Sequence, residues 1–134
     1  MQEYYSRKII WKIIYRVWLP VLRLIELLKL HNSRQKYFLG HLSSNYNKES
    51  FNKFLEEQDF RMDIIAYKDP GQILGMRKLD TPLYQYHIRL FVDGEIRGHY
   101  EYTPEAKPVA HSLETGIQPR NEFFKKLLGG YLIV

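Results

Sequence analysis

The sequence predicts an α+β domain in which N-terminal amphipathic helices pack on a roughly four-stranded antiparallel sheet, followed by a short C-terminal helix. Three patterns support this class: an apolar stripe at helical spacing in residues 7–30, strand-like alternation between residues 60 and 102, and a helical segment before Gly129. With 134 residues, the chain is long enough to form one domain with its own core. We therefore expect a single domain over 1–134, mainly helical over 1–58, a sheet over 59–103, and a loop and short helix over 104–134.

The first expected helical segment runs from Arg7 to Leu30. Its lysines, arginines and single glutamate recur at spacings of three, four and seven, so at 100° per residue they share one side, opposite an Ile/Val/Leu stripe. Pro20 predicts a kink or the start of a second helix. Five charges between Ile9 and Leu30 argue against a transmembrane span, which needs about 20 largely apolar residues.

Positive charge is concentrated at the N-terminal end of the chain. Residues 1–48 hold nine lysines and arginines against two acids, a net charge of +7, whereas residues 49–134 have a net charge of −2. We expect helix 7–30 to cover the sheet. A basic helix with Trp11 and Trp18 could instead lie on a membrane surface, or pack on a partner helix. The protein is thus expected to be cytoplasmic, with peripheral membrane contact as the alternative.

The rest of the chain divides at its turn residues. A short helix is expected over Arg34 to Leu42 and another from an N-cap at Asn47 to near Gln58. The expected strands, turns and helix that follow are strand 60–67, a type II turn at 69–71, strand 72–79, a turn at 80–82, a hairpin over 82–102, a loop over 105–118 and a helix over 120–128. The apolar tail 131–134 could add to a sheet edge.

The hairpin fixes its own register. Asp93-Gly94 lies between two alternating runs, which is a strong hairpin signal. A three-residue loop, with Gly94 as the left-handed residue, pairs Leu90 with Ile96 and separates the faces cleanly, whereas a two-residue loop mixes apolar and charged residues. One face then carries four tyrosines that we expect in the core rather than stacked on bases: Tyr84, Tyr86, Tyr100 and Tyr102.

The other face of the hairpin carries the candidate functional residues. Three pairs lie opposite one another on it: Arg89 with Arg97, His87 with His99, and Gln85 with Glu101. Like charges across strands repel, so a bound anion would stabilise the arginine pair. The alternative is that both arginines pair with Glu95, Glu101 or an aspartate elsewhere, or point into water.

Binding of an anionic partner, either nucleic acid or a phosphate-bearing ligand, is the function this face favours. Arg89, Arg97 and Gln85 would bind it, and for nucleic acid a basic stretch adds phosphate contacts from Arg7, Lys8, Lys12 and Arg16. One alternative is a metal-independent phosphodiesterase or ribonuclease, with His87 and His99 as base and acid beside Glu101. This set of residue types resembles that of small metal-independent ribonucleases in constellation alone, without a family motif.

Three further alternatives remain for the same residues. His87 and His99 with a carboxylate or His111 could bind Zn or Fe, although the adjacent arginines disfavour a cation, so neither a metal nor another cofactor is expected. The histidines could be purely structural. The protein could also be a structural protein or one that interacts with a membrane surface.

The absence of cysteine rules out disulfides, thiolate metal ligands and cysteine nucleophiles. The oligomeric state is left open.

Overall fold

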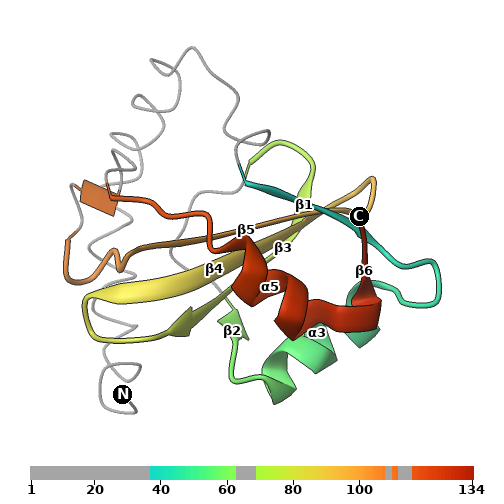
Figure 1. The fold of residues 1–134 in the computed structure, drawn as a ribbon, viewed down its shortest axis with the longest axis horizontal. Helices are drawn as coiled ribbons and strands as arrows, with labels where there is room; N and C mark the ends of the chain where they lie inside the picture. Colours follow the sequence, from blue (N-terminus) through green and yellow to red (C-terminus); the bar gives the residue numbers. More distant parts are fainter. Residues whose placement is uncertain (1–36, 63–68, 108–109, 112–115) are drawn as a thin grey trace.

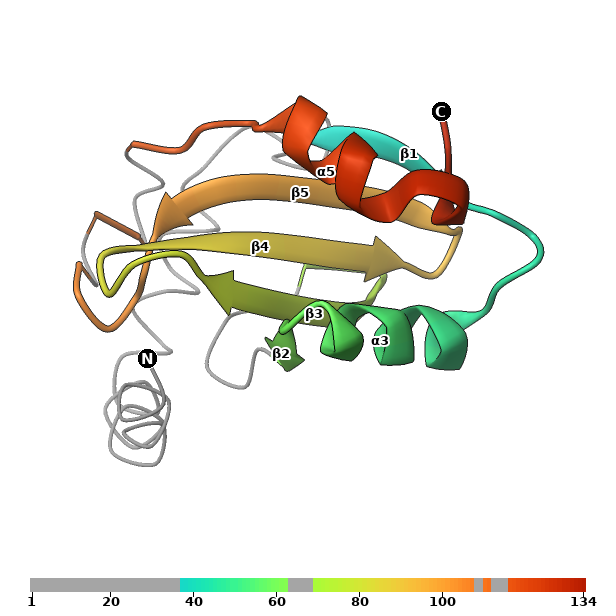
Figure 2. The same cartoon turned by 60° about the horizontal axis from the view of Figure 1, so that its bottom comes forward.

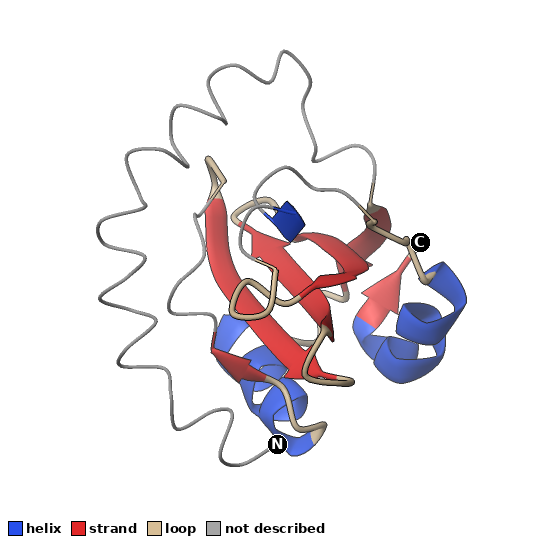
Figure 3. Cartoon of the chain, turned by 90° about the vertical axis from the view of Figure 1, so that its left-hand side faces the viewer, coloured by secondary structure: helices blue, strands red, loops and turns tan. Residues whose placement is uncertain are grey.

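A six-stranded antiparallel sheet forms the centre of the computed structural model, which describes residues 37–62, 69–107, 110–111 and 116–134 (Figures 1 and 3). The order of its strands is β2-β3-β4-β5-β1-β6. Their bounds are β1 Phe38–Leu42, β2 Arg61–Met62, β3 Gln72–Leu79, β4 Tyr84–Phe91, β5 Glu95–Tyr102 and β6 Leu132–Ile133. The predicted α+β class is confirmed, but the sheet is larger than the four strands expected.

Both additional strands come from segments outside the expected sheet region. The prediction of a short helix over Arg34 to Leu42 is wrong for 38–42, because β1 pairs with β5 instead, with a register shift between Phe38 and Gly40. Glycine is a poor helix former, and Leu39 is buried in the core by the strand arrangement. The apolar tail supplies β6, which adds to the edge of its own sheet by pairing with β1.

Two helices lie together on one side of the sheet (Figure 2). The first, α3 (Lys48–Glu57), begins at the predicted N-cap, where the Asn47 side chain accepts a hydrogen bond from the Ser50 backbone N–H. The second, α5 (Asn121–Leu128), confirms the expected C-terminal helix. Their buried residues Phe51, Leu55, Phe124 and Leu128 complete a core with the apolar side chains of β1, β3, β4 and β5. The predicted helices of residues 7–30 fall outside the described residues.

The predicted hairpin register is confirmed in every pair. Leu90 lies opposite Ile96 and His87 opposite His99. The loop between β4 and β5 has three residues, and Gly94 takes φ 87°, the left-handed conformation that glycine adopts without strain. The Asp69-Pro70-Gly71 turn also forms, with φ 82° at Gly71 and the Gln72 N–H donating to the Asp69 carbonyl.

The tyrosines of the hairpin lie on the helix side of the sheet. Tyr100 is buried and donates to Asp80, and Tyr86 stacks on Phe123 of α5. Tyr84 and Tyr102 are half-buried and stack on each other. The apolar face therefore belongs to the helices, and the opposite face remains for the candidate site. None of the helices in the described part of the chain has the length and apolar character needed to cross a membrane.

Candidate functional site

All six predicted site residues share the face opposite the helices, and all are buried. Even the most exposed of them, Arg89, keeps only 8% of its surface accessible. β3 extends the face, because Arg77 lies directly opposite His87. Buried polar side chains are costly unless their hydrogen-bonding groups are satisfied, so the contacts of each one matter.

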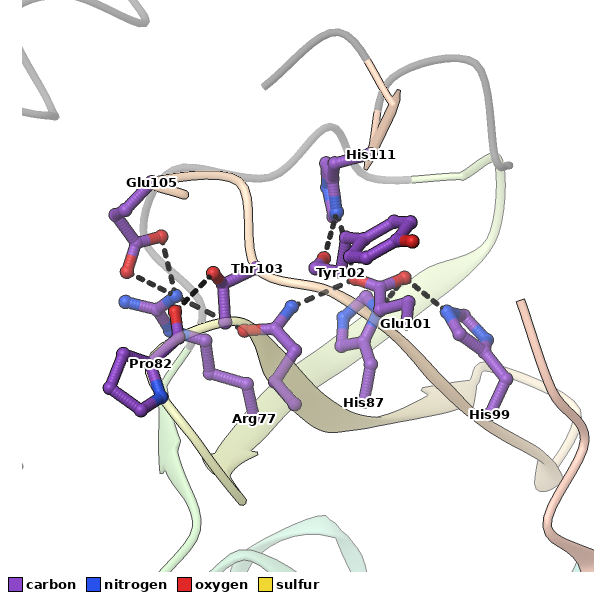
Figure 4. A network of polar contacts seen from close by, with 10 residues as sticks. Arg77, Pro82, His87, His99, Glu101, Tyr102, Thr103, Glu105 and His111 are labelled. Carbon is purple, nitrogen blue, oxygen red and sulfur yellow. Dashed lines mark hydrogen bonds and ion pairs between the residues drawn. The ribbon is translucent and has the colours of Figure 1, made fainter. Parts of the chain in front are cut away.

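Glu101 is the centre of this face (Figure 4). Its Oε1 is hydrogen-bonded to His99 Nε2 and lies 3.8 Å from His87 Nδ1. Its Oε2 accepts a hydrogen bond of 2.8 Å from Gln85 Nε2 and lies 3.0 Å from His111 Nδ1. Three imidazoles, from two strands and the segment after β5, thus meet one carboxylate. We call His87, His99, Glu101 and His111 the histidine–glutamate cluster.

Burial and mutual charge shift the pKa values within the histidine–glutamate cluster in different directions. Burial alone would raise the pKa of Glu101, but the charges of His111 and His99 hold it well below its usual range. Burial lowers the pKa of His99 despite the opposing effect of Glu101. Burial would also lower the pKa of His111, yet the Glu101 carboxylate raises it. The surroundings therefore favour the ionised form of Glu101, whereas burial favours the neutral form of His99.

Each arginine of the face has its own carboxylate. Arg89 forms an ion pair with Asp69, which precedes β3, and Arg97 forms one with Glu95, two residues before it on β5. The expected repulsion between these arginines is therefore relieved within the protein, as in the alternative that paired them with Glu95 or an aspartate. Anion binding is not needed to explain why two arginines lie opposite one another.

A third ion pair closes the other end of the face. Arg77 Nη1 lies 2.6 Å from Glu105 Oε1, and both side chains are almost fully buried. The same nitrogen donates to Gln85 Oε1 at 3.1 Å. Because Gln85 bonds Arg77 through its oxygen and Glu101 through its nitrogen, it connects this ion pair to the histidine–glutamate cluster. Gln85 thus holds Glu101 in place, in addition to any contact with a ligand.

Two buried nitrogen atoms of the face have no hydrogen-bond partner among the described residues. They are Arg89 Nε and His99 Nδ1. A guanidinium stays protonated in proteins, so Arg89 Nε is a donor that lacks an acceptor. Native structures leave few such atoms, and an unseen ligand or water is a usual explanation. These atoms mark where the face could receive a ligand.

Three residues important for this face were not identified from the sequence: Arg77, Glu105 and Asp69. Arg77 could have been found, because Leu74 and Met76 alternate with it along β3 and place it on the opposite face. Glu105 follows the end of β5 in an irregular segment, where no side-chain period applies. Asp69 was predicted only as a turn residue.

The chemistry available here is that of imidazole and carboxylate. His87, His99 and Glu101 each offer one ligand atom within 4.8 Å of the others, so these three could hold a metal ion or exchange protons with a ligand. Comparisons with known proteins add no function, since no protein family, no curated protein and no solved structure matches the chain.

Proposed function

We propose that the polar face of the β4–β5 hairpin binds a phosphate-bearing ligand. The observation that carries this proposal is the buried Nε–H of Arg89, which lacks an acceptor among the described residues while Arg89 Nη1 contacts Asp69. A buried donor left unsatisfied costs about 1–3 kcal/mol, and a phosphate oxygen would remove that cost. Guanidinium groups suit phosphate because their donors match its oxygens in geometry and charge.

The burial of this face favours a small ligand over a nucleic acid. Arg97 and His99 are exposed by only 2% and 4% of their surfaces, respectively. A polyanion that follows an open groove needs charged side chains on the surface, which these are not. Nucleic-acid contacts through Arg7, Lys8, Lys12 and Arg16 fall outside the described residues. We therefore propose a phosphate group on a small molecule as the ligand.

Replacing Arg89 by glutamine tests this proposal. The Arg89→Gln variant should bind inorganic phosphate about tenfold or more weakly than the unaltered protein, because a charged hydrogen bond of about 1.5–3 kcal/mol is lost. Isothermal titration calorimetry with phosphate, at constant ionic strength, measures the change. Arg61→Gln is the matched control, since Arg61 is exposed on β2 and its Nη1 donates to backbone carbonyls. Equal phosphate affinity of Arg89→Gln and Arg61→Gln would refute the proposal.

Metal-independent hydrolysis of a phosphodiester is a second candidate, favoured by the two imidazoles that approach Glu101 Oε1. The His87 and His99 rings lie 5.3 Å apart between centroids. One imidazole would take the proton of the attacking hydroxyl as the new phosphorus–oxygen bond forms. The other would give a proton to the leaving oxygen as the old bond breaks.

This candidate makes its own prediction. Chelator-treated protein should hydrolyse a small phosphodiester, bis(para-nitrophenyl) phosphate, and His99→Ala should slow hydrolysis by about a hundredfold or more, as expected for the loss of a positioned acid or base. The absorbance of the released para-nitrophenolate measures the rate. His41→Ala, at an exposed histidine of β1, is the control and should hydrolyse the ester normally. If the chelator-treated protein leaves the phosphodiester intact, the hydrolytic candidate is withdrawn and ligand binding remains.

A further inference from the structure

We infer that His87, His99 and Glu101 form a binding site for one divalent transition-metal ion, of the Zn²⁺ or Fe²⁺ class. The site lies on the same face as the proposed phosphate site, but it is argued from different atoms. Two imidazole nitrogens and a carboxylate oxygen are ligands that Zn²⁺ and non-haem Fe²⁺ use in proteins. One such atom from each residue lies within 4.8 Å of the other two. Small movements of these side chains would bring all three to one ion.

The two oxygens of Glu101 have separate roles in this arrangement. Oε2 accepts a hydrogen bond from Gln85 Nε2 at 2.8 Å and lies 3.0 Å from His111 Nδ1. Oε1 faces the two strand histidines. Hydrogen bonds to the oxygen that does not bind the metal are what orient a carboxylate ligand. Gln85 and His111 therefore position Glu101, and Oε1 is the coordinating atom.

The electrostatic objection to a cation at this place is removed by the ion pairs. From the sequence, Arg89 and Arg97 disfavoured a metal because they are adjacent to the histidines. In the structure Asp69 and Glu95 neutralise them, and Glu105 neutralises Arg77. A metal ion would then take Glu101 as its anionic ligand and keep a net positive charge. It would give a phosphate group a second contact besides Arg89.

His99 also has the second nitrogen that a metal ligand needs. When Nε2 coordinates, Nδ1 carries the proton and is normally hydrogen-bonded, which fixes the ring. His99 Nδ1 is buried without a partner among the described residues, while its ring packs against Tyr37 at 4.9 Å between centroids. Ring packing therefore orients His99, and water or the phosphate-bearing ligand would accept a hydrogen bond from Nδ1–H.

Metal titration of the full chain tests the inference. Protein freed of metal by chelator and dialysis is titrated with Zn²⁺ in a calorimeter, and separately with Co²⁺, whose visible spectrum reports nitrogen and oxygen ligands. We expect one ion bound per chain. The variants Glu101→Gln and His99→Ala should each bind Zn²⁺ about tenfold or more weakly, and His41→Ala, at the exposed histidine of β1, should bind normally.

A measurement on the unaltered protein keeps the test decisive if a variant fails to fold. In NMR spectra, Zn²⁺ should shift the imidazole signals of His87 and His99 and leave those of His41 unchanged. The inference is overturned if Zn²⁺ leaves the His87 and His99 signals unchanged. It is equally overturned if the folded Glu101→Gln variant binds Zn²⁺ as tightly as the unaltered protein.

A titration with inorganic phosphate distinguishes the metal site inferred here from the phosphate site of the proposed function. Inorganic phosphate is titrated into metal-free and Zn²⁺-loaded protein. Zn²⁺ binding without phosphate binding supports the metal site and contradicts the phosphate ligand. Phosphate binding to metal-free protein that fails to bind Zn²⁺ supports the phosphate ligand and contradicts the metal site. Tighter phosphate binding by the Zn²⁺-loaded protein supports both.

Discussion

The Glu105→Ala variant is expected to be destabilised by about 3–5 kcal/mol. Glu105 is the carboxylate partner of Arg77, and both side chains are buried with 4% and 3% of their surfaces exposed. Removing it takes a carboxylate away from the buried Arg77 guanidinium and leaves the neutral Gln85 oxygen in contact with it. Removing one partner of a buried ion pair has a cost of this size. Urea unfolding followed by circular dichroism measures the loss.

A charge-free double variant separates the ion pair from simple truncation. Arg77→Met with Glu105→Leu removes both charges and keeps apolar volume, so it should be close to the unaltered protein in stability. Glu57→Ala, at an exposed position of α3, should change the free energy of unfolding by about 0.5 kcal/mol or less. If the double variant is as unstable as Glu105→Ala, the cost comes from lost packing rather than from the broken ion pair.

The hairpin could be predicted because its information is local. Asp93-Gly94 fixes the loop, and the alternation on either side allows only one register with a clean apolar face. The shared face of His87, His99 and Glu101 follows from that register alone. The register of the hairpin is therefore sufficient to place these three residues close together.

The extra strands could not be predicted in the same way. β1 contains Gly40 and is five residues long, and β6 has two residues. Neither shows a period long enough to distinguish a strand from a helix or a loop. They form because a distant edge is available: β5 for β1, and β1 for β6. Pairing between segments so far apart in the chain leaves no local signal.

The carboxylate partners of the arginines could not be assigned from the sequence for a related reason. Glu95 lies two residues from Arg97 and was one of the carboxylates considered. Asp69 is 20 residues from Arg89, and Glu105 is 28 residues from Arg77. These long-range contacts decide whether an arginine is left to bind an anion from solution or already pairs with a carboxylate of the protein. This is why the repulsion between Arg89 and Arg97 that the sequence suggested is relieved by carboxylates that the sequence did not place beside them.

Phe124→Ala is expected to destabilise the protein by about 3–5 kcal/mol, since Phe124 is fully buried between α5 and the sheet. Its ring occupies the space above Gly98, where an added Cβ would lie 2.9 Å from the ring and 3.0 Å from Leu39 Cδ1. Gly98→Ala alone should therefore cost about 1–3 kcal/mol through overpacking. Combined with Phe124→Ala it should cost less, because the ring is gone and only Leu39 must move. A double-mutant cycle from urea unfolding measures this coupling.

Phe123→Ala, at the half-buried neighbour of Phe124, is the control and should lose less stability than Phe124→Ala. Strict additivity of the Phe124 and Gly98 changes would mean that α5 is not packed on β5 as described.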